Sequence, residues 1–150
     1  MAVAKGDYEQ CKTVARQFLK TAEWCFGDGL IDLIGGNIYP FAVNASFACE
    51  AFIKAIMIRN SNNGEFITGH NLNALFKELD PEIKESIKTI FNSHFSVLSL
   101  EQFLEKDNKC FEDWRYTFEN TGEARRVNPH GLMAFAKSLD EYVSKFEVTE

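Results

Sequence analysis

Residues 41–58, which read FAVNASFACEAFIKAIMI, are apolar almost all the way round the turn of a helix. A helix without a polar face has to be enclosed by neighbouring elements on several sides. The segment is also about as long as a membrane span, but it carries Asn44, Glu50 and Lys54, and charged side chains inside a span are costly. We therefore expect a buried helix over about 39–59 in a protein with no membrane partner, and the rest of the chain has to cover it.

Apolar residues at helical spacing predict the elements that cover this helix. From Tyr8 they recur in alternating steps of three and four up to Cys25, where glycines follow, so a first amphipathic helix is expected there. Start signals predict the later helices, through an N-cap, a proline in the first turn or a capping box. These helices are expected at His70–Leu79, from Asp80–Pro81, from Ser99 with Gln102, and from Asn128–Pro129 to Val143.

The connections carry no strand signal. Residues 27–37 read as a loop with at most one helical turn, and residues 60–69 read as a turn-rich loop. No segment alternates with the period of two that a strand shows. With 150 residues, 45% of them hydrophobic and 14 of them Phe, the chain has the size of one domain with an aromatic core. We predict an all-α, antiparallel bundle of five to six helices that forms a single domain over residues 1–150.

Charge and cysteine usage limit the partners. The formal net charge is −6, and an acidic surface repels a polyanion at long range, so a contact with nucleic acid would need a locally basic patch. The four cysteines show no spacing typical of a metal site, and the N-terminus has no hydrophobic signal region. We expect reduced thiols, no metal or other cofactor, and a cytoplasmic location.

Three stretches on these helices carry polar residues: NASFACEAFIKAIMI, then GHNLNALFKEL about twenty positions later, then FEDWRYTFE. Their marks are Glu50, Lys54, His70, Arg115 and Tyr116. In this order and at this spacing they resemble a HEPN domain, the small helical domain that is widespread in prokaryotic defence and toxin systems. The resemblance covers roughly residues 7–143.

The resemblance implies an antiparallel helical bundle, commonly a homodimer with a cleft between the protomers. Active members of the family resemble metal-independent RNases, and they use an Arg and a His separated by four to six residues. Many other members lack this motif and are thought to bind RNA or nucleotides, or to act as partners of other proteins. We therefore expect a homodimer whose ligand is RNA or a nucleotide, or whose partner is an antitoxin-type protein.

Arg125 and His130 form the pair that fits the spacing of this motif, because four residues separate them, whereas Arg115 has no histidine at an allowed distance. Asn128 and the proline after it place His130 in the first turn of a helix, where backbone N–H groups and the dipole favour an anion. Arg125 or Arg126 would clamp a phosphate, and His130 would exchange a proton with the ribose hydroxyl or the leaving oxygen.

Three functions stay open. Active members usually carry a polar residue such as Asn directly after the arginine, but Arg126 occupies that position here, and a proline precedes His130. The arginines then read as solvated loop residues, and this departure, together with the acidity, favours a noncatalytic module that binds RNA, a nucleotide or a protein. The alternatives are a metal-independent endoribonuclease toxin that uses Arg125 and His130, and an adaptor bundle with no nucleic-acid role.

The other polar marks have a structural and a functional interpretation. Glu50 and Lys54 are four residues apart in the favourable order for a helical ion pair. They either line a ligand cleft or form a buried pair that fixes the register of the helices, with Arg115 as a further partner. His70 is expected to cap a helix or to bond a loop, and His94 to be a core or boundary histidine.

Overall fold

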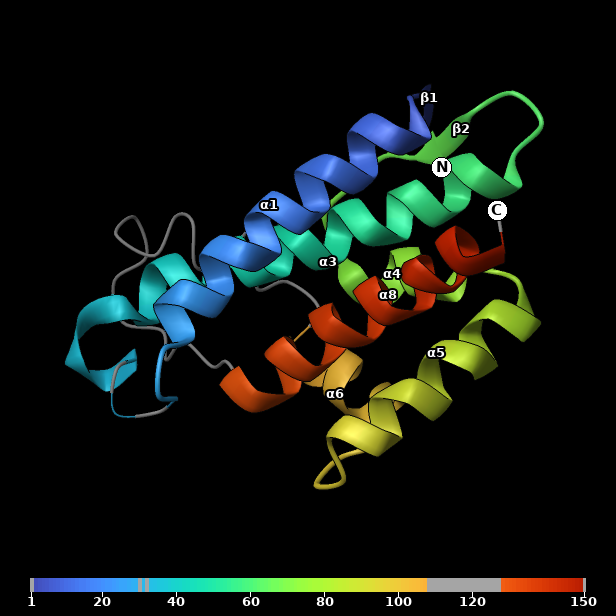
Figure 1. Ribbon diagram of the computed structural model, residues 1–150. Helices are drawn as coiled ribbons and strands as arrows, with labels where there is room; N and C mark the ends of the chain where they lie inside the picture. Colours follow the sequence, from blue (N-terminus) through green and yellow to red (C-terminus); the bar gives the residue numbers. More distant parts are fainter. Residues whose placement is uncertain (1, 30, 32, 108–127, 150) are drawn as a thin grey trace.

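The computed structural model describes residues 2–29, 31, 33–107 and 128–149, and it shows a helical bundle (Figure 1). Six α-helices lie within these ranges. The central one, α3 (Ile38–Asn60), contacts α1 (Tyr8–Phe26), α4 (Leu72–Lys77) and α8 (Pro129–Thr149). The prediction of an all-α bundle is confirmed, and the apolar segment around residues 41–58 is its enclosed helix.

Helices α1 and α3 lie side by side and run in opposite directions (Figure 1). Asp7 caps α1, because its carboxylate accepts the N–H of Gln10 at 2.8 Å, and the helix ends at Phe26. The following Gly27 has a φ of 51°, a left-handed conformation that suits glycine. Ala15, Ala22 and Cys25 of the predicted stripe lie on the buried face of α1, together with Lys12 and Leu19.

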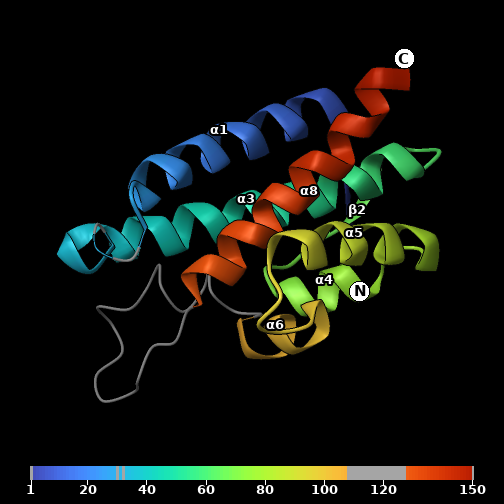
Figure 2. The same ribbon diagram turned by 60° about the horizontal axis from the view of Figure 1, so that its bottom comes forward.

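Helix α8 lies between α3 and α5 (Pro81–His94) in both views of the bundle (Figures 1 and 2). Beneath it, α6 (Leu100–Asp107) completes the core. The rings of Phe91, Phe103 and Phe135 join α5, α6 and α8, with centroid distances of 5.9–6.4 Å. A side chain at Gly131 would come within 2.9 Å of Phe103, so the start of α8 can approach α6 only because this residue has none.

Most of the predicted helix starts are confirmed. Ser99 and Gln102 form a reciprocal capping box, with bonds of 3.1 and 3.0 Å. The Oδ1 atom of Asn128 accepts the N–H of Gly131 at 2.9 Å at the start of α8. Asp80 does hold the N-cap position of α5, but its side chain makes no cap hydrogen bond.

Two short strands contradict the expectation that the chain has none. β1 (Val3–Lys5) pairs antiparallel with β2 (Glu65–Ile67), inside the stretch expected to be a loop. Strands of three residues are too short to show an alternating pattern, and their pairing depends on chain path, which local sequence does not encode. The stretch expected to hold at most one helical turn contains η1 (Leu33–Asn37), which leads into α3 through a kink at Gly36, where φ is 136°.

One stretch among the described residues, Gly35–Asn60, is by length and composition alone long and apolar enough to cross a membrane. However, 72% of its apolar window is buried inside the bundle. The core helix of a bundle is also long and apolar, because neighbouring helices enclose it on several sides.

Candidate functional site

The sequence-predicted site residues fall into three groups. Arg115, Tyr116, Arg125 and Arg126 lie outside the described residues. Asn128 and His130 lie at the start of α8, and Glu50, Lys54 and His70 lie together where the second half of α3 meets the loop before α4. The structure thus brings Glu50 and Lys54 of α3 together with His70 of the following loop. His130, the histidine of the proposed motif, lies at the start of α8 and is not part of this cluster.

Glu50 is the centre of the first cluster. Its side chain is 4% exposed, and its two oxygens have separate partners: Lys54 Nζ at 3.0 Å and His70 Nδ1 at 2.8 Å. The Lys54 ammonium also lies 5.6 Å from the centre of the Phe66 ring, on β2. Because both oxygens of the buried carboxylate have partners, the cluster holds α3, β2 and the approach to α4 in register, and Glu50 is not open to a ligand.

His70 lies at the start of α4, as expected, but it does not cap the helix. It precedes α4, and the helix is capped by Asn71, whose Oδ1 atom accepts the N–H of Ala74 at 2.9 Å. An amide oxygen is a better N-cap than an imidazole, which leaves the His70 ring to reach back to Glu50. His70 is 45% exposed, so it closes the cluster from the solvent side.

Cys11 lies near this cluster as a partly buried thiol. Its thiol donates to the Ala51 carbonyl at 3.2 Å. Burial raises the pKa of the Cys11 thiol to about 11, although the charge of Lys54 acts in the opposite direction. Such a thiol stays protonated at neutral pH, so it packs as a small apolar group.

The second group lines a hollow of about 530 Å³ at the amino end of α8, which we call the α8 hollow. It lies where the ends of α1 and α5 meet the start of α8. Its wall is partly aromatic and aliphatic, and its polar side chains include three basic ones. The lining residues are Phe26, His94, Phe95, Val97, Asn128, His130, Met133, Ala134 and Lys137.

His130 is exposed in this hollow and is held by an aromatic neighbour. Its ring meets that of Phe26 edge to face, with the centroids 5.4 Å apart and an angle of 86° between the planes. The sequence led us to expect several backbone N–H groups for an anion here. In fact Asn128 uses two of them, since its side chain takes the N–H of Gly131 and its carbonyl takes that of Leu132. Pro129 has none, so within this first turn the N–H of His130 remains.

His94 reaches the same hollow from the last turn of α5, where sequence reasoning expected a core or boundary residue. It is exposed, and its Nε2 atom lies 2.8 Å from the Glu141 carboxylate. That His94 and His130 line the same hollow depends on how α5 packs against α8, and no local sequence pattern predicts it. The place of Lys137 could have been predicted from the sequence, because positions 130, 134 and 137 lie on the same face of a helix.

Lys137 and His130 give the α8 hollow a locally basic rim on an acidic protein. Lys137 is exposed and has no ionic partner among the described residues. His94 differs from Lys137 in having a carboxylate, that of Glu141, beside it at 2.8 Å. The arrangement can therefore receive an anionic group at Lys137 and His130 and an apolar or aromatic group against the wall.

A metal site is not formed by the part of the chain that the structure describes, since no three His, Cys, Asp or Glu side chains gather there in a way that could hold an ion. The chemistry of the α8 hollow is that of imidazole, ammonium and aromatic groups. Comparisons of this chain with family models, with curated proteins and with solved structures found no match.

Proposed function

We propose that this chain is a HEPN-like module that binds RNA or a nucleotide in the α8 hollow without cleaving it, acting as a cytoplasmic homodimer in prokaryotic defence or regulation. The observation that carries the proposal is the combination of aromatic walls and a basic rim in one hollow. Its volume of about 530 Å³ lies within the range of small-ligand sites.

The lining matches the two chemical parts of a nucleotide. Phe26 and Phe95 offer ring surface on which a base can stack, and stacking of this kind tolerates any base. Lys137 offers positive charge to a phosphate, and His130 offers its ring nitrogens for hydrogen bonds. Because the net charge of the chain is −6, binding of a polyanion has to concentrate at such a local patch.

The first turn of α8 leaves the contact with a phosphate mainly to the side chains of the hollow. Asn128 and Pro129 leave it with the single N–H of His130, which is a weak anion site compared with a turn that presents several donors. Cleavage further needs groups that stabilise the extra charge of the transition state. The arginines expected in that role, Arg125 and Arg126, lie outside the described residues.

Apolar surface supports the dimer part of the proposal. Trp24 near the end of α1 is 83% exposed, and Ile31 and Tyr39, which precede or begin α3, are 82% and 52% exposed. Large apolar side chains gathered at one end of a protein mark an interaction surface. Light scattering on the wild type and on a Trp24→Ser, Ile31→Ser variant tests this, since a dimer built on this surface dissociates in the variant.

RNA binding is tested by fluorescence polarisation with a labelled single-stranded RNA at low salt, in EDTA. Lys137→Ala and His130→Ala are each expected to weaken binding about fivefold, because each removes one contact to phosphate. Lys5→Ala is the matched control, since it removes an exposed lysine on β1, outside the hollow. An equal loss in Lys5→Ala would show nonspecific attraction, and no binding at low salt would leave the adaptor function instead.

A second function, that of a metal-independent endoribonuclease, is favoured by one observation: His94 and His130 line the same hollow. Two imidazoles can share acid–base work, one taking the proton of the ribose 2′-hydroxyl while the 2′-oxygen attacks phosphorus, the other protonating the departing 5′-oxygen. The products are a 2′,3′-cyclic phosphate and a 5′-hydroxyl. Arg125 would clamp the phosphate, as the sequence motif suggests.

Incubation with total RNA in EDTA separates the two functions. An enzyme degrades the RNA, and Arg125→Ala, His130→Ala and His94→Ala each suppress the cleavage. RNA that stays intact with the wild type, together with binding that depends on Lys137, supports the noncatalytic module.

A further inference from the structure

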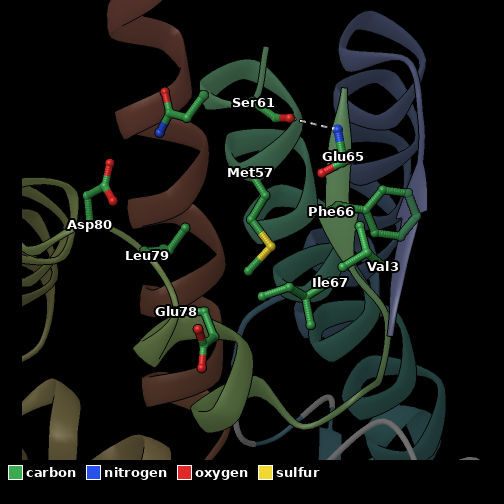
Figure 3. A pocket seen from close by; sticks show the side chains of 10 residues that line it. Val3, Met57, Ser61, Glu65, Phe66, Ile67, Glu78, Leu79 and Asp80 are labelled. Carbon is green, nitrogen blue, oxygen red and sulfur yellow. Dashed lines mark hydrogen bonds between the residues drawn. The ribbon is translucent and has the colours of Figure 1, made fainter. Parts of the chain in front are cut away.

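A second hollow lies between β2 and the turn that joins α4 to α5, and we call it the acidic groove. It has a volume of about 280 Å³. Its floor is apolar, with Met57 from α3, Leu79 from the turn and Ile67 from β2 (Figure 3). This floor is continuous with the core at Leu79, which is 5% exposed.

One wall of the acidic groove is the unpaired edge of β2. The bonds from Thr68 N to Ala2 O and from Gly6 N to Gly64 O show that residues 64, 66 and 68 face β1. The backbone groups of Glu65 and Ile67 therefore point the other way. The Glu65 N–H donates to Ser61 Oγ at 3.1 Å, and both residues line the groove, so this edge faces the groove (Figure 3).

Hydrogen-bonding capacity remains on that edge. Among the described residues, neither the N–H nor the carbonyl of Ile67 has a partner, and the carbonyl of Glu65 has none. A β-strand edge with open groups beside an apolar floor is the arrangement to which an extended peptide adds as a further strand.

The charges around the groove all have one sign. Glu65 stands on one side, and Glu78 and Asp80 stand on the other (Figure 3). All three are exposed, and none has an ionic partner among the described residues. Lys5 lies opposite Glu65 in the register of the strands, outside the lining, and forms no ion pair with it. The groove thus offers three carboxylates to a cationic occupant.

We infer that the acidic groove binds an extended, basic segment of a partner polypeptide, which adds to β2 as a third strand. Its main chain bonds to the open groups of Ile67 and Glu65, and its apolar side chains lie on Met57 and Leu79. Its Lys or Arg side chains reach Glu65, Glu78 and Asp80. This site is separate from the α8 hollow and does not depend on RNA binding.

The test uses a labelled, end-blocked peptide of alternating Val and Lys, measured by fluorescence polarisation with the full chain at about 50 mM salt. Glu65→Gln, Glu78→Gln, Asp80→Asn is expected to weaken binding about tenfold or more, because it removes all three carboxylates. The matched control, Glu23→Gln, Glu85→Gln, Glu105→Gln, removes as much exposed charge elsewhere and is expected to change binding less than about twofold. Circular dichroism confirms that both variants are folded.

A second peptide separates strand addition from mere attraction of charge. Methylation of every amide nitrogen keeps the peptide's charge but removes its N–H donors, and it is expected to weaken binding about tenfold. The inference is overturned if the unmodified peptide does not bind, if both triple variants lose binding equally, or if the methylated peptide binds as well. Displacement by spermidine at the peptide's own affinity would also overturn it, since the groove would then be a simple cation site.

Discussion

Glu50 with His70 and Glu141 with His94 are both glutamate–histidine pairs with a nitrogen–oxygen distance of 2.8 Å. Their surroundings differ. The side chain of Glu50 is 4% exposed and has Lys54 as a second partner, whereas that of Glu141 is 52% exposed. The comparison teaches that two pairs with the same nitrogen–oxygen distance contribute differently to the free energy of unfolding when one is buried and the other is exposed.

Water explains the difference. A carboxylate at the surface that loses its partner is solvated again, so a pair such as Glu141–His94 contributes about 0–1 kcal/mol. A buried charge that loses its partner has no such replacement, so breaking the pair leaves an uncompensated charge. We therefore expect the Glu50 cluster to govern folding, and the Glu141–His94 pair to govern the charge that a ligand meets in the α8 hollow.

The largest effect is expected from Glu50→Ala. It leaves Lys54, whose side chain is 13% exposed, without its buried partner, and it should lower the free energy of unfolding by about 3–5 kcal/mol. Urea denaturation followed by circular dichroism measures this. Glu141→Ala is the matched change at the exposed pair and should cost about 1 kcal/mol or less. Similar losses in the two variants would refute the distinction.

A smaller loss is expected from Lys54→Met. The Glu50 carboxylate keeps His70 in this variant, so the free energy of unfolding should fall by about 2 kcal/mol, the size of one bond to a charged group. The double variant Glu50→Ala, Lys54→Met should lose less than the sum of the two single losses, by about 1 kcal/mol or more. Additive losses would mean that the two side chains act independently.

The sequence could predict what depends on local spacing. The pairing of Glu50 with Lys54 follows from a separation of one helical turn, and the Asn128 cap follows from a residue type next to a proline. His70 as the third member of the cluster could not be foreseen, because it arrives through the path of the loop that contains β2. The position of His94 in the same hollow as His130 likewise depends on the packing of α5 against α8. Arg115 and Arg125 lie outside the described residues, so their predicted roles stay predictions.

A third carboxylate, that of Glu147, adds a test in which the contribution to stability depends on pH. Glu147 is 41% exposed, but it bonds both Arg16 and Lys12, and these bonds hold the pKa of its carboxyl at about 2, below the ordinary 4.5. A depressed pKa means that the stabilisation is present above pH 4.5 and is lost as the pH falls towards 2. The difference in urea midpoint between wild type and Glu147→Gln should shrink over that interval. A constant difference would show that the bonds to Arg16 and Lys12 do not act through charge.

The smallest effect on stability, and the most informative one on function, is expected from Glu141→Gln. Because the carboxylate is exposed, its loss should change the free energy of unfolding by less than about 1 kcal/mol. The same change removes the negative charge beside His94, at the rim of a hollow that also contains Lys137 and His130. The potential there becomes more positive, so affinity for single-stranded RNA should rise about two- to threefold at low salt, and the gain should fade as salt is added. Weaker RNA binding by a fully stable Glu141→Gln variant would mean that the carboxylate orients His94 for the ligand instead of opposing it.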